Sequence, residues 1–116
     1  MIRVTPASRV SEAAQELNVA TRFGRMDVAL ERVASAARDD FAKRHAAWGN
    51  GLRINDTEFA GMILRDRDHA EVYVHVTWQR LDEADLRTTT VTQRWVDQKG
   101  SWQLVSEERT GGDLGL

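Results

Sequence analysis

Trp78, Gln93 and Glu108 are the side chains of this sequence whose types and spacing best suit ligand chemistry. Side chains two residues apart along a strand point to one face, and the alternation in the last third of the chain predicts that all three share a face. A carboxylate and a carboxamide beside an indole ring can anchor a small molecule in a pocket. The same carboxylate can instead form an internal tie, with Glu108 paired to Arg22 or Arg25, because an unpaired buried charge is costly.

The three histidines do not have the spacing of a metal site. His45, His69 and His75 never stand four residues apart, and the chain has no cysteine that could complete a zinc set. We read His45 as a helix-edge residue, His69 as a turn residue and His75 as an interface residue. We expect no metal ion and no cofactor.

The composition fits one ordinary globular domain. Of the 116 residues, 41% are hydrophobic and 29% are charged, and the formal net charge is -2. This charge gives no electrostatic footprint for nucleic acid, and no stretch approaches the roughly 18 apolar residues of a membrane span. We therefore expect neither a nucleic-acid partner nor an integral membrane segment.

The first residues carry no apolar signal segment, so the chain as given predicts a cytoplasmic protein. A leader trimmed ahead of Met1 would instead make it the soluble part of an envelope protein, such as a lipoprotein. The absence of cysteine leaves the redox compartment open.

Two helical patterns occupy the first half. The first helix is expected to begin at Ser8 or Ser11 and to end near Phe23. A second apolar stripe is expected to bend near Ser35 and to stop at residues 49–51, where glycine favours a helix end. The members of this second stripe are Met26, Leu30, Val33, Ala37, Phe41 and Trp48.

The second half predicts four strands. Residues 52–64 form a weak and bulged first strand, and turn tips at 83–84 and 99–100 join the remaining three. In this register Val76 faces Val91, and one face is apolar enough to be covered by the helices. Its members are Val72, Val74, Val76, Trp78, Val91, Gln93, Trp95, Trp102, Leu104, Ser106 and Glu108.

The reverse face of the predicted sheet is too apolar for plain solvent exposure and too polar for a core. Such a mixture suits the interface of a symmetric homodimer. Arg94 and Glu107 could form self-complementary contacts across it. The expected interface residues are Tyr73, His75, Thr92, Arg94 and Val105.

Helices followed by a curved antiparallel sheet, with a final hairpin reading QRWVDQKGSWQLVSEER, resemble the nuclear transport factor 2-like superfamily, also called the cystatin-like or ketosteroid-isomerase-like fold. The resemblance implies an α+β cone in which helices and sheet enclose a cavity, often as a dimer. The domain is expected to span residues 11–110, with an extension at 1–10 and a flexible tail at 111–116.

An isomerase of that superfamily needs a carboxylate base and a tyrosine donor on the first helix. The tyrosine of this chain, Tyr73, lies in the predicted sheet, and Asp56 and Glu58 are read as surface acids. The sequence therefore predicts a non-catalytic ligand-binding or interaction domain, with a possible small-molecule ligand. The alternative is a small isomerase or dehydratase-like enzyme acting on a small apolar ligand in the cavity.

Overall fold

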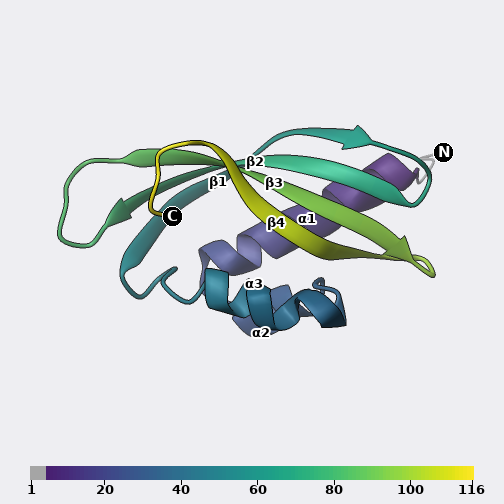
Figure 1. Ribbon diagram of the computed structural model, residues 1–116, viewed down its shortest axis with the longest axis horizontal. Coiled ribbons are helices and arrows are strands. Elements are labelled where there is room, and N and C mark those ends of the chain that lie inside the picture. Colours follow the sequence, from purple (N-terminus) through teal and green to yellow (C-terminus); the bar gives the residue numbers. More distant parts are fainter. Residues whose placement is uncertain (1–4) are drawn as a thin grey trace.

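The computed structural model describes residues 5–116, in which helices come first and a four-stranded antiparallel sheet follows (Figure 1). The strands lie in the order β1-β2-β3-β4, so each pairs with its neighbour in the chain. This arrangement confirms the predicted α+β class. The elements are α1 (Pro6–Arg22), α2 (Met26–Leu30), the 3-10 helix η1 (Ser35–Ala37), α3 (Arg38–Arg44), β1 (Leu52–Leu64), β2 (His69–Arg80), β3 (Arg87–Gln98) and β4 (Ser101–Gly112).

Helix α1 begins earlier than the sequence analysis predicted. Thr5 is its N-cap and exchanges hydrogen bonds with Ser8, while Pro6 occupies the first helical position, where its missing N–H needs no partner. The start expected at Ser8 or Ser11 is therefore wrong. Of the predicted extension, residues 1–4 lie outside the described residues, and residues 6–10 belong to α1.

The second helical stripe is divided by a short extended segment. After α2, the backbone runs beside β4: the amide of Leu104 donates to the carbonyl of Arg32 at 2.7 Å, and the amide of Ala34 donates to the carbonyl of Leu104 at 2.9 Å. The bend expected near Ser35 thus exists. The extended segment just before it covers part of the edge of β4, which would otherwise offer unpaired backbone groups.

Strands β2 and β3 pair two residues away from the predicted register. Val74, rather than Val76, lies opposite Val91. A shift by an even number leaves every side chain on its predicted face. The predicted core members of the inner face are each at most 3% exposed: Val72, Val74, Val76, Trp78, Val91, Trp95, Trp102 and Leu104.

A β-bulge in β4 changes the faces of its second half. Trp95 pairs with Leu104 as predicted, but Arg94 then pairs with Ser106, so Val105 is an extra residue. Gln93 consequently lies opposite Glu107. From Ser106 to Arg109, each side chain of β4 therefore lies on the face opposite to the predicted one.

Glu107 now occupies the inner face and Glu108, paired with Thr92, occupies the outer face. The predicted placement of these two acids is therefore wrong.

Helix α1 runs diagonally across the sheet (Figure 1), and α2 packs against α1. The hydrophobic core, where the resemblance implies a cavity, includes Leu17 of α1 with Trp78 and Trp95 of the sheet, each at most 1% exposed. Within residues 5–116, no helix has both the length and the apolar character needed to cross a membrane.

Candidate functional site

A buried polar cluster joins the helices to the inner face of the sheet. The carboxylate of Glu107 lies 2.7 Å from Nε2 of His45 and accepts a 2.9 Å hydrogen bond from Nε2 of Gln93. Nε2 of Gln93 also donates to Oδ1 of Asn18 at 2.9 Å. The side chains of His45 and Glu107 are only 2% and 7% exposed.

Each member comes from a different element. Asn18 lies on α1, His45 directly follows α3, Gln93 lies on β3 and Glu107 on β4. Oε1 of Gln93 accepts from Nδ2 of Asn18 at 3.4 Å and from Nε1 of Trp95 at 3.3 Å, so the carboxamide uses all of its hydrogen-bonding capacity. The cluster therefore joins α1 and the end of α3 to the sheet.

His45 is held between two aromatic rings. It stacks on Phe41, with ring centroids 4.0 Å apart, and meets Trp48 at 4.1 Å and a tilt of 58°. The interpretation of His45 as a helix-edge residue is therefore wrong. His45 follows Phe41 by four residues and precedes Trp48 by three, so the helical spacing contained a signal for its burial.

The environment of Glu107 favours its ionised form. Burial alone would raise the pKa of this carboxyl group, but the hydrogen bond and charge of His45, with smaller contributions from Gln93 and Arg109, hold the pKa below its ordinary value. A general acid or base works best with a pKa near the operating pH. At neutral pH Glu107 is instead a permanent hydrogen-bond acceptor.

This lowered pKa predicts a loss of stability in acid. Because the folded state binds the Glu107 proton more weakly than the unfolded chain does, its contribution is fully present above the ordinary glutamate pKa of about 4.3. That contribution is lost as the pH falls through the lower folded-state pKa. We expect denaturant midpoints between pH 3 and pH 7 to fall less steeply on acidification in Glu107→Gln than in the wild-type protein. Equal slopes would exclude this role for Glu107.

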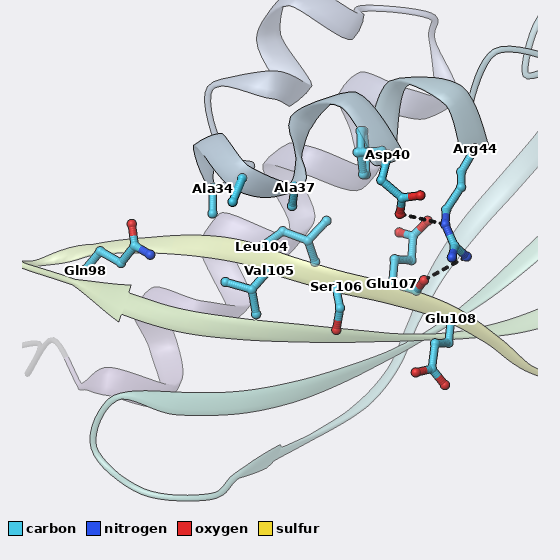
Figure 2. A pocket seen from close by; sticks show the side chains of 12 residues that line it. Ala34, Ala37, Asp40, Arg44, Gln98, Leu104, Val105, Ser106, Glu107 and Glu108 are labelled. Carbon is cyan, nitrogen blue, oxygen red and sulfur yellow. Dashed lines mark hydrogen bonds and ion pairs between the residues drawn. The ribbon is translucent and has the colours of Figure 1, made fainter.

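A groove of about 410 Å³ separates η1 and α3 from β4, and Glu107 lines it. Figure 2 shows the side chain of Glu107 pointing toward α3 and that of Glu108 pointing away. Above the strand, Nε of Arg44 donates to Asp40 at 2.8 Å, and Nη1 of Arg44 donates to the carbonyl oxygen of Glu107 at 3.2 Å. The charged end of the groove is thus internally paired.

The structure does not bring the three predicted pocket residues together. Trp78 is buried, and its Nε1 donates to Oγ1 of Thr89 at 2.9 Å. Trp78 lies opposite Arg87, six residues along β3 from Gln93, which is about 20 Å of strand. Gln93 alone of the three lies in the buried cluster.

Glu108, the third predicted pocket residue, is 56% exposed on the outer face, where it pairs with Arg94 at 3.0 Å. The internal tie expected for Glu108 with an arginine is made instead by Glu107 with His45. Arg22 pairs with Asp56 at 3.5 Å.

The five predicted interface residues lie on the outer face of the sheet, the side opposite α1. Tyr73 pairs with Thr92 across β2 and β3, and His75 is exposed. Val105 is half-buried beside Arg94. The predicted contact of Arg94 with Glu107 is wrong, because the bulge puts Glu108 there instead.

Glu71 organises the charges of this outer face. Nη2 of Arg65 donates to it at 3.1 Å, the hydroxyl of Tyr73 donates to it at 2.9 Å, and Nε of Arg94 lies 4.0 Å away. The bond from Arg65, followed by that from Tyr73, lowers the pKa of Glu71, and the bond to Glu71 raises the pKa of Tyr73. The phenol therefore remains protonated and serves as a hydrogen-bond donor.

Across residues 5–116, no three histidine or acidic side chains are grouped as metal ligands would be. His69 contacts Asp66, with 2.9 Å between Nδ1 and Oδ1, at the turn into β2.

No protein-family model and no curated protein matches the chain. The solved structures similar to it include three at 14–15% identity. A protein of unknown function with a cystatin-like fold from Nostoc punctiforme has a TM-score of 0.61 at 15% identity, covering 99% of this chain and 98% of that one. A SEC-C motif containing protein from Rhodopseudomonas palustris has a TM-score of 0.66 at 15% identity, covering 80% and 72%.

The third structure, the intermembrane space region of the chloroplast protein ARC6, has a TM-score of 0.59 at 14% identity and covers 93% of this chain and 98% of that one. At these identities the likeness establishes the fold alone. The chain has a cystatin-like α+β fold.

Proposed function

We propose that this protein is a non-catalytic binding domain of the nuclear transport factor 2-like superfamily and that it acts as a homodimer through the outer face of its sheet. The observation that carries the proposal is the pairing of the inner acid. Glu107 lies 2.7 Å from Nε2 of His45 and accepts from Gln93, and its surroundings hold the pKa of its carboxyl group below the ordinary value, so this carboxyl does not keep the proton that a general acid must donate at neutral pH. The outer face of the sheet is the surface that we propose for binding.

The outer face supports the dimer by its pairing of charges. Glu71 with Arg65, and Glu108 with Arg94, are already joined within one protomer, so a second copy can cover them without leaving an unpaired buried charge. Val105 adds apolar surface beside these pairs. A two-fold axis through this face would bury the same patch of both protomers.

Val105→Asp tests the dimer. Sedimentation at micromolar concentration is expected to give twice the chain mass of 13.1 kDa for the wild-type protein and the single mass for the variant. The added carboxylate would have to lose its water in the interface without a partner. Leu86→Asp, at an exposed position in the β2–β3 loop, is the matched control and should remain dimeric. A wild-type mass near 13.1 kDa would refute the dimer.

A small isomerase or dehydratase is the second candidate, and one observation favours it. Glu107 and His45 form a carboxylate–imidazole pair, and Glu107 lines a groove of about 410 Å³, a size that a small molecule could fill. Catalysis by Glu107 as a general acid would require its carboxyl group to hold a proton near neutral pH. The titration of this carboxyl group tests that role.

A further inference from the structure

A second groove, larger than the first, lies between α1 and α2 and has a volume of about 800 Å³. Two apolar side chains stand open along it: Val19 on α1 is 53% exposed, and Phe23, the residue directly after α1, is 66% exposed. Ala20 and Val28 complete its apolar wall. Val19 and Phe23 are four positions apart, about one helical turn, so they form an apolar strip at the end of the helix.

The other end of this groove is acidic. Glu12 and Glu16 on α1 and Glu31 directly after α2 line it. Glu16 is neutralised by Arg32 at 2.6 Å, whereas within residues 5–116 neither Glu12 nor Glu31 forms an ion pair. Two carboxylates are therefore available to a ligand at the end of the groove away from Phe23.

The groove is long. From Glu12 on α1 to Phe23 just past its end, the groove follows a rise of eleven residue steps, which is about 16 Å at 1.5 Å per residue. Val19 also forms a wall of a smaller groove toward Phe59 on β1, and Phe59 is itself exposed. An elongated ligand with apolar side chains on one face matches this shape better than a compact molecule does.

We infer that the α1–α2 groove binds an amphipathic helix of a partner protein. Apolar side chains of that helix would pack on Val19 and Phe23, and its lysine or arginine side chains would meet Glu12 and Glu31. The inference rests on the proposed binding function and names a partner class for a surface other than the dimer face.

The test uses two synthetic helical peptides of roughly four turns, about 15 residues. Both carry leucine at helical spacing on one face, and one has lysine and the other glutamate at the flanking positions. NMR titration of the full chain should show saturable shifts at Val19, Ala20 and Val28 with the lysine peptide, and binding about 10-fold weaker with the glutamate peptide. Equal binding of both peptides, or no saturable shift, would overturn the inference.

Variants at exposed positions keep this test independent of folding. Phe23→Ser should weaken binding of the lysine peptide at least about 10-fold, while the control Leu86→Ser should leave it unchanged. Combining Glu12→Lys with Glu31→Lys should reverse the preference between the peptides. Concentration-dependent shifts at Val19 in the free protein would mean that a second copy fills the groove, which also overturns the inference.

The outcome is separable from the dimer proposal. Phe23 directly follows α1 and does not lie on the outer sheet face, so Phe23→Ser should leave the sedimenting mass unchanged. Absence of peptide binding by a wild-type protein that sediments as a dimer would reject the groove proposal alone.

Discussion

Replacing Glu107 with alanine is expected to lower the free energy of unfolding by about 2–4 kcal/mol, because Nε2 of His45 and Nε2 of Gln93 lose an acceptor inside the protein. The next residue supplies a matched control. Glu108→Ala removes the same number of atoms from an exposed pair with Arg94 and should change the free energy by no more than about 0.5 kcal/mol. Denaturant unfolding at one protein concentration measures both.

This pair of variants tests the β-bulge itself. If the strand continued without the extra residue at Val105, Glu108 would be the buried acid and the two effects would be exchanged. A larger loss for Glu108→Ala than for Glu107→Ala would contradict the described register.

Trp95→Ala is expected to cost about 3–5 kcal/mol, a large part of the stability of a domain of this size. Trp95 is fully buried opposite Leu104, and its Nε1 donates to Gln93, so its loss leaves both a cavity and a weakened polar cluster. Leu81→Ala, at an exposed loop position, should be nearly neutral. An unchanged denaturant midpoint for Trp95→Ala would remove this residue from the core.

The fold was predictable from the sequence because strong apolar markers identify its faces. The alternating valines of β2 ending at Trp78, and the tryptophans of β3 and β4, point to the same side in any register that differs by an even number of residues. The real β2–β3 register differs by two. The predicted faces of the two strands are therefore correct, although the predicted pairs of opposite residues are not.

The buried acid was not predictable in the same way. After Leu104 the strand reads Val-Ser-Glu-Glu-Arg, with adjacent glutamates and no later apolar residue to mark a side. A bulge at Val105 changes which glutamate faces inward without any change in the pattern. Two like residues in succession make the alternation ambiguous.

The start of α1 and the burial of His45 did leave signals in the sequence. Thr5 followed by Pro6 is a typical helix start, and His45 shares the helical spacing of Phe41 and Trp48. A buried histidine on an apolar stripe also needs a hydrogen-bond partner for its ring. That partner, Glu107, is 62 residues away in the chain and is brought to it only by the packing of α3 against β4.

The central claim is that the inner acid of this fold is a structural acceptor and that function lies on the binding surfaces. Carbon-13 NMR titration of the Glu107 carboxyl group tests it most directly. The claim predicts that the carboxyl remains ionised throughout the neutral range and takes up its proton only below the ordinary glutamate pKa of about 4.3. Protonation of Glu107 near neutral pH, as a catalytic acid would show, would contradict it.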